Sequence, residues 1–153
     1  MEFEICFLEF GTTVPILEFE TSIMGFFSKL TGKDDTTKKT GIQWHQLTTE
    51  AELEAIIERS NTVPCAIFKH STRCSISSMA LSRFERQWDL DSTEIEPYYL
   101  DLIAHRSVSD KIAEVLFIQH QSPQIILLKD GKAIYDTSHN DITVEGLKAI
   151  LKA

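Results

Sequence analysis

The chain has 153 residues, of which 42% are hydrophobic and 25% charged, a composition typical of one globular domain with a single substantial core. Its 15 Lys and Arg residues are outnumbered by 23 Asp and Glu residues, which gives a formal net charge of -8. Phosphate backbones and anionic lipid headgroups repel such an acidic chain, so we expect neither nucleic acid nor a membrane as a partner.

The cysteine content indicates a reducing compartment. Three cysteines, Cys6, Cys65 and Cys74, cannot all be paired, and their number is far below that of a disulfide-stapled secreted domain. The first four residues include Glu2 and Glu4 where a secretory signal needs positive charge, and no long apolar stretch follows. The expectation is a cytoplasmic protein.

Residues 1–41 differ from the rest of the chain. Residues 1–23 mix Phe, Ile, Leu and Glu without a sustained period, which predicts either a disordered extension or a start assigned too early, with Met24 as the preferred native beginning. Residues 32–41 are polar and bounded by glycines, so they cannot bury enough apolar surface to order themselves. We interpret 1–41 as an extension with a polar linker and 42–153 as the domain.

The domain is predicted to begin with a strand, a helix and a second strand. Residues 42–47 alternate apolar and polar side chains, as a half-buried edge strand does. Thr49 and Glu52 have the spacing of a capping box, so a helix begins there. Residues 63–68 form an apolar run opened by Pro64, which favours a central strand covered on both faces. The helix between these strands is expected to bury one face, made of Ala51, Leu53, Ile56 and Ile57.

Helices and strands continue to alternate after Cys74. A helix follows this cysteine, residues 96–102 predict a strand, and another helix begins near Ser107. A last helix closes the chain. The buried stripes expected from the three- and four-residue spacing are Ile76, Met79, Ala80, Phe84 and Trp88 in the first helix, Val108, Ile112, Val115 and Leu116 in the second, and Val144, Leu147, Ile150 and Leu151 in the last.

The element order predicts the fold class. Residues 124–128 and 133–135 read as strands joined by Asp130–Gly131, the strongest short-range hairpin signal. Helical crossovers impose parallel pairing and a tight turn imposes antiparallel pairing, so the order predicts an α/β fold with a mixed central sheet, in which helices flank a βαβ half and a ββα half. This is the order of a thioredoxin-like fold. In such folds a cis proline precedes the hairpin, so we expect a cis Ser122–Pro123 bond.

Cys74 is the predicted nucleophile. It stands where the apolar run at 63–68 gives way to a helix, and the free amides and positive dipole end of a helix N-terminus favour thiolate over thiol. Its neighbours are polar, unlike those of Cys65, which lies inside the apolar run and is expected to be structural. Positive charge near the sulfur is expected from Arg73, and from Lys69 or His70 if these side chains point toward it.

Three segments carry a resemblance to a known family: Phe-Lys-His-Ser-Thr-Arg-Cys-Ser-Ile-Ser at 68–77, His-Gln-Ser-Pro-Gln at 120–124, and Ser138–His139. Over residues 42–153 the chain resembles the YtxJ-like monothiol bacilliredoxins. The family loop usually reads Thr-Cys-Pro-Ile-Ser, from which Arg73 and Ser75 depart. The resemblance implies removal of bacillithiol, a small cysteine-containing thiol, from its mixed disulfides with proteins, so bacillithiol would be a co-substrate and no cofactor would be tightly bound.

The residues favour a monothiol scheme. Ser77 stands where a two-cysteine thioredoxin has its second cysteine, and a hydroxyl cannot form a disulfide, so a second small thiol must resolve the intermediate. The expected partners are S-thiolated proteins and a small thiol, and the expected assembly is a monomer. No metal-ligand spacing is present. We expect Ser77, Arg73, Ser75 and Ile76 to stabilise the thiolate, and Thr72, Ser122, Pro123 and Gln124 to form the substrate site.

Two other classes stay open. The loop Cys-Ser-Ile-Ser resembles in outline the Cys-Gly-Phe-Ser loop of monothiol glutaredoxins that share an iron–sulfur cluster, although the glycine, the phenylalanine and a downstream Gly-Gly are absent. A noncatalytic thioredoxin-like adaptor is the other class, and it predicts that replacing Cys74 changes no redox readout. His70, His120 and His139 are more simply polar strand-end or loop residues than bases, although His139 could lie near a carboxylate of the small thiol.

Overall fold

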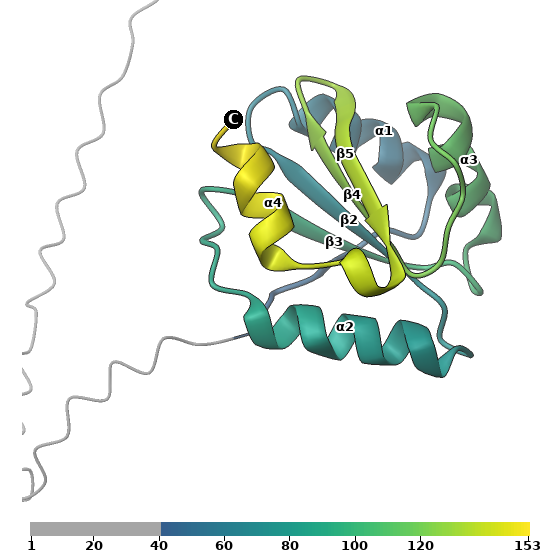
Figure 1. Cartoon of the computed structure of the whole chain (residues 1–153). Helices are drawn as coiled ribbons and strands as arrows, with labels where there is room; N and C mark the ends of the chain where they lie inside the picture. Colours follow the sequence, from purple (N-terminus) through teal and green to yellow (C-terminus); the bar gives the residue numbers. More distant parts are fainter. Residues whose placement is uncertain (1–40) are drawn as a thin grey trace, which may run out of the picture. The chain divides into compact units, whose positions relative to one another are not determined.

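The computed structural model describes residues 41–153, which form a sheet with helices on both faces (Figure 1). The predicted extension, the start preferred at Met24 and all but the last residue of the polar linker lie outside the described residues. The domain boundary at residue 42 therefore stays a prediction. Within residues 41–153, no helix is long and apolar enough to cross a bilayer.

The described elements follow the predicted order. The sheet order is β1-β3-β2-β4-β5, in which β1, β3 and β2 are parallel and β4 and β5 are antiparallel to their neighbours. The α/β class and the thioredoxin-like arrangement of a βαβ half and a ββα half are confirmed. The bounds are β1 His45–Gln46, α1 Glu50–Arg59, β2 Cys65–His70, α2 Ser75–Gln87, β3 Glu96–Asp101, α3 Arg106–Leu116, β4 Gln124–Lys129, β5 Lys132–Ser138, the short 3-10 helix η1 His139–Asp141, and α4 Val144–Leu151.

The central strand is β2, as its apolar run predicts. Pro64 precedes it, and all six residues of the strand are buried. The strand runs two residues beyond the apolar run, to His70, so Lys69 and His70 are buried as well. The first edge strand is shorter than predicted, since only His45 and Gln46 pair with β3.

The hairpin between β4 and β5 turns at Asp130 and Gly131, as predicted. Both residues have positive φ, 53° and 71°, which is the backbone that a type I′ turn needs at its two central positions. The Ser122–Pro123 peptide bond just before β4 is cis. The turn therefore brings β5 back beside β4, and the loop before β4 returns the chain to the end of the sheet where β2 finishes.

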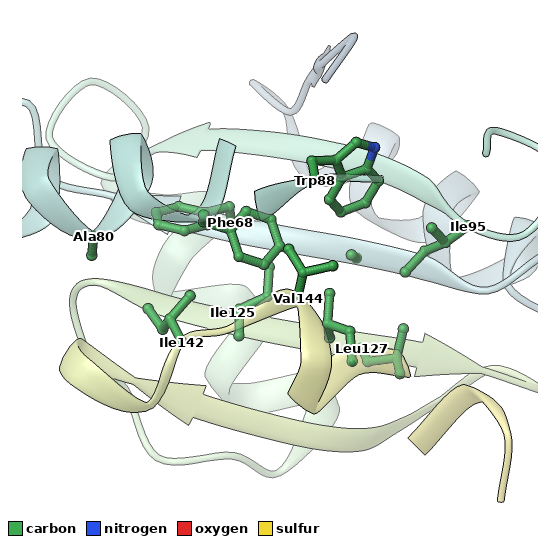
Figure 2. Packing of buried hydrophobic residues seen from close by; sticks show 11 residues of the cluster. Phe68, Ala80, Trp88, Ile95, Ile125, Leu127, Ile142 and Val144 are labelled. Carbon is green, nitrogen blue, oxygen red and sulfur yellow. The ribbon is translucent and has the colours of Figure 1, made fainter. Parts of the chain in front are cut away.

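Each face of the sheet has its own apolar core. Helices α2 and α4 cover one face, where Figure 2 shows Phe68 and Val144 among the buried side chains. Helices α1 and α3 cover the other face, where Ile67 and Ile112 are buried. The side chains of the first cluster are Ala66, Phe68, Ala80, Phe84, Trp88, Ile95, Ile125, Leu127, Ile142, Val144 and Leu147. Those of the second are Leu47, Leu53, Ile56, Cys65, Ile67, Leu100, Val108, Ile112, Ile126 and Leu128.

Helix α1 begins with the predicted capping box. The Glu52 amide donates to Thr49 Oγ1 at 3.2 Å, and the Thr49 amide donates to Glu52 Oε2 at 3.0 Å. These two bonds satisfy amides that the first turn of a helix leaves free. Ala51 is exposed, contrary to the expected stripe, because the buried face of this helix is centred on Leu53 and Ile56.

The prediction of the buried stripe of α2 is wrong for the first turns of the helix. Ile76 and Met79 are 52% and 62% exposed, whereas Ser77 is buried. The buried residues are Ser77, Ala80 and Phe84, so the stripe passes one position later than the apolar pattern indicates. A polar residue can occupy this buried position because its hydroxyl finds hydrogen-bond partners there, as described below. Two apolar side chains are left facing solvent in the turn that follows Cys74.

Candidate active site

Cys74 is the N-cap residue of α2. Its backbone is extended, with φ -114° and ψ 117°, and its carbonyl accepts the Ser78 amide at 3.1 Å, so the helix starts with the next residue. Its own amide donates to the Ser71 carbonyl at 3.0 Å, which closes a turn between β2 and α2. The thiol makes no capping hydrogen bond and is partly exposed. The sulfur is therefore reachable and stands at the positive end of the helix.

Ser77 holds the turn that carries this cysteine. Its buried hydroxyl accepts the Ser71 amide at 3.0 Å and lies 2.7 Å from His70 Nδ1. Burial lowers the pKa of His70, which favours the neutral ring at pH 7. The predicted role of Ser77 at the thiolate stays a prediction, since the hydrogen bonds described for its hydroxyl connect α2 to the end of β2.

A Ser77→Ala variant is expected to be less stable by about 1–3 kcal/mol, because it leaves the partly buried Ser71 amide and the buried His70 Nδ1 without their partner. Chemical denaturation of the purified domain measures this change. Ser82→Ala, at an exposed position of the same helix, is the matched control and should change stability by less than about 0.5 kcal/mol. Equal stabilities of the two variants would contradict this role of Ser77.

Other residues predicted around the sulfur lie at the surface. Arg73, Ser75 and Ile76 are exposed on either side of Cys74, and their effect on the thiolate stays a prediction. Thr72 is exposed, and its hydroxyl donates to Asp101 Oδ1 at 3.3 Å. The loop is therefore tied to the end of β3 while its polar face stays open to solvent.

Pro123 lies at the same end of the sheet as Cys74, but it is buried, so its predicted direct contact with a substrate is not supported by its exposure. The antiparallel register pairs Lys69 of β2 with Gln124 of β4, so Pro123 follows in register beside the last residue of β2. The Pro123 carbonyl accepts the backbone amide of His139 at 3.2 Å, which brings η1 to this edge. Ser122 is partly exposed, but its hydroxyl oxygen is buried and has no hydrogen-bond partner among residues 41–153.

Gln124 requires a correction. Its side chain is fully buried, so it cannot contact a protein substrate directly. Instead Nε2 donates to the Gln119 carbonyl at 3.0 Å and to Asp136 Oδ2 at 3.1 Å, while Oε1 accepts the Gln121 amide at 3.2 Å. Gln124 therefore supports the loop before Pro123 from inside the fold.

Cys65 has the properties of an inert thiol. It is fully buried in β2, and its thiol donates to the Val63 carbonyl at 3.3 Å. Burial is the main cause that raises the pKa of the Cys65 thiol to about 12. A thiol that stays protonated and out of contact with solvent does not compete with Cys74 for disulfides.

One buried charge was missed by sequence reasoning. Lys69 is 0% exposed, and its Nζ lies 2.9 Å from His120 Nδ1. Its ammonium group therefore points to the loop before β4, and it is not an exposed positive charge beside the Cys74 sulfur. In the sequence alone, a lysine that follows an apolar run is typical of the exposed end of a strand. Its burial becomes clear only because β2 extends to His70. The available signal was its position, which alternates with Phe68 and His70 and so faces α1 and α3.

Comparisons with known proteins agree with this geometry. A family model for monothiol bacilliredoxin BrxC matches residues 45–147. A thioredoxin-fold protein provisionally assigned as an oxidoreductase is 30% identical, with a TM-score of 0.60, over 69% of this chain and 90% of that one. The thioredoxin of Malassezia sympodialis is 18% identical with a TM-score of 0.56, over 73% of this chain and 90% of that one.

Mitochondrial thioredoxin 3 from Saccharomyces cerevisiae is also 18% identical, with a TM-score of 0.54, over 71% of this chain and 93% of that one. Similarity at this level shows the fold alone, whereas the family model covers most of the domain and includes both the Cys74 turn and Pro123. The fold and the family are those of a thiol redox protein. The chain therefore belongs to the monothiol bacilliredoxin family.

Proposed function

We propose that this protein is a monothiol oxidoreductase that removes bacillithiol from mixed disulfides with proteins. The observation that carries the proposal is that Cys74 is the one partly exposed cysteine among residues 41–153. It stands at the N-terminus of α2, with a buried serine one helical turn later. Because Ser77 cannot form a disulfide, the intermediate on Cys74 must be resolved by a thiol from outside this domain. The match to the bacilliredoxin family supports bacillithiol as that thiol.

The reaction needs two exchange steps. In the first, the Cys74 thiolate attacks the bacillithiol sulfur of the mixed disulfide, the protein thiolate leaves, and Cys74 holds bacillithiol as a new disulfide. In the second, another bacillithiol thiolate attacks the bacillithiol sulfur of that adduct, which releases bacillithiol disulfide and restores Cys74. No net oxidant is consumed, since one disulfide is exchanged for another at each step.

The surface beside Cys74 supports a protein as substrate. Ile76 and Met79 lie in the first turns of α2 and are 52% and 62% exposed, so two large apolar side chains face solvent on the helix for which Cys74 is the N-cap residue. Burial of both against a partner would stabilise a complex in which the sulfur is at the centre of the contact. At the Ser122–Pro123 edge Pro123 is buried and its carbonyl accepts the His139 amide, so the backbone of the partly exposed Ser122 would pair with the substrate backbone. Backbone pairing makes recognition tolerant of sequence. We propose that the protein acts in the cytoplasm as a monomer.

Mass spectrometry after exposure to bacillithiol disulfide tests the proposal. We expect one bacillithiol adduct, located on Cys74 by peptide mapping, that forms faster than the adduct from an equal concentration of glutathione disulfide. Added bacillithiol should then remove it. An adduct on Cys65 would contradict the scheme, and faster reaction with glutathione disulfide would contradict bacillithiol as the co-substrate.

A further inference from the structure

A buried lysine lies beneath the loop that leads to Pro123. Lys69 is fully buried, which is rare for lysine, and its Nζ lies 2.9 Å from Nδ1 of His120, an exposed residue of that loop. The hydroxyl of Ser109 in α3 lies 3.3 Å from the same nitrogen. An ammonium group can only donate, so Nδ1 must accept, and His120 is neutral with its proton on Nε2.

A second buried side chain holds the same loop. The register pairs Lys69 with Gln124, and directly opposed residues of an antiparallel pair project from the same face of the sheet. Gln124 donates to the Gln119 carbonyl and accepts the Gln121 amide. Lys69 and Gln124 together therefore bind three consecutive residues, 119–121, from beneath, and we refer to the two side chains as the buried clamp.

We propose that Lys69 is a positioning residue that acts through His120 to hold residues 119–122 in the conformation that presents the Ser122–Pro123 edge to a protein substrate. This inference rests on the proposed function, in which that edge pairs with the substrate backbone. His120 is two residues before Ser122, so movement of the His120 ring away from Lys69 would displace the segment that enters the edge. Cys74 is carried by a different turn, which Ser77 and His70 hold independently of the clamp.

Burial of this ammonium makes a stability role a poor explanation. Desolvation is the main cause that lowers the pKa of Lys69 to about 8, which means that the fold disfavours the charged form. Lys69→Met removes the buried charge itself, and its partner His120 is an exposed neutral ring, so the variant leaves no uncompensated charge inside the fold. A Lys69→Met variant should therefore fold at least as stably as the wild type, and any loss of reaction rate can be assigned to positioning.

The test compares two rates for each protein. One is the second-order rate of Cys74 with a peptide mixed disulfide that carries bacillithiol, and the other is its rate with iodoacetamide, which needs no substrate groove. In Lys69→Met we expect the peptide rate to fall by about fivefold, the size expected for one net hydrogen bond, and the iodoacetamide rate to stay within about twofold. Lys132→Met, which removes an exposed lysine in the distant hairpin, should change neither rate.

The pH dependence of the peptide rate divided by the iodoacetamide rate is a second readout. A lysine with a purely structural role would not change this dependence. Protonation turns His120 Nδ1 into a donor, so Lys69 loses its acceptor. Burial, and next the charge of Lys69, hold the pKa of His120 below its usual 6.5, so the wild-type ratio should fall as the pH drops through that lower range. The ratio cancels the thiolate fraction of Cys74. The other charged groups that face His120, Arg106 and Asp110 of α3, are present in both proteins, and the ratio for Lys69→Met should be flat.

Two outcomes overturn the inference and can be told apart. If the wild type attacks the peptide mixed disulfide and Lys69→Met does so at the same rate with the same pH profile, Lys69 does not position the edge, while the proposed function stands. If the wild type reacts with iodoacetamide but does not attack the peptide mixed disulfide, the proposed function fails and this inference fails with it.

Discussion

A Cys74→Ser variant is expected to lose thiol–disulfide exchange down to the uncatalysed background, a decrease of at least about a thousandfold, as is usual for removal of an attacking nucleophile. A serine hydroxyl is almost entirely protonated at neutral pH and does not attack a disulfide. Release of a protein thiol from a bacillithiolated substrate, followed by gel shift or mass spectrometry, measures the loss.

Cys65→Ala is the matched control for this variant. Cys65 is fully buried and its thiol has a pKa of about 12, so the variant should keep its exchange rate within about twofold. Its cost should appear as a moderate loss of stability, because a small cavity forms in the central strand. Retained exchange in Cys74→Ser would favour the noncatalytic adaptor. Loss of exchange in Cys65→Ala would indicate that Cys65 is needed for the reaction and would contradict the assignment to Cys74.

A Phe68→Ala variant is expected to lose about 3–5 kcal/mol of unfolding free energy, the usual cost of truncating a buried phenylalanine. Phe68 is fully buried at the centre of the sheet, with its ring centroid 5.7 Å from that of Phe84 and 6.0 Å from that of Trp44. Figure 2 shows it among the buried side chains of the cluster under α2 and α4. A domain of this size has about 5–15 kcal/mol of stability in total, so this single change should remove a large part of it.

Urea denaturation followed by tryptophan fluorescence measures the loss, since Trp44 and Trp88 both pack on this cluster. Phe68→Leu should lose less than half as much, because most of the volume is retained. Ile134→Ala in β5 is the surface control, since Ile134 is 42% exposed, and its change should be below about 1 kcal/mol. A loss of stability in Phe68→Ala as small as that of the control would contradict the central place of Phe68 in the cluster under α2 and α4.

Local sequence signals predicted most of the fold. The apolar run after Pro64, the Thr49–Glu52 capping box and the Asp130–Gly131 turn each depend on chemistry within a few residues. The cap and the turn form as predicted, and the run forms the central strand, which extends two residues further, to His70. The candidate nucleophile was predictable for the same reason, since Cys74 lies directly between a strand and the helix that it caps. Fold class follows from the order of such signals, because crossover helices and tight turns restrict how strands can pair.

Side-chain environments at the site were less predictable. Ile76 and Met79 match the apolar period of α2 but are exposed, since the buried stripe passes through Ser77. Gln124 was predicted at the substrate but is enclosed beneath the loop. In both cases the sequence pattern gives the spacing of the residues. It does not give the rotation of the helix or strand about its own axis, which decides which side chains face the core.

The sequence by itself determined the chain's order of strands and helices, the position of Cys74 at a helix N-terminus and the absence of a second cysteine at Ser77, because these are properties of neighbouring residues. Only the tertiary structure decided that Lys69 is buried against His120 and that Ser77 connects α2 to His70. These contacts join residues 51 and seven positions apart, and they form because β2, α2 and the loop before β4 meet at one end of the sheet, where polar groups withdrawn from water must find partners in one another.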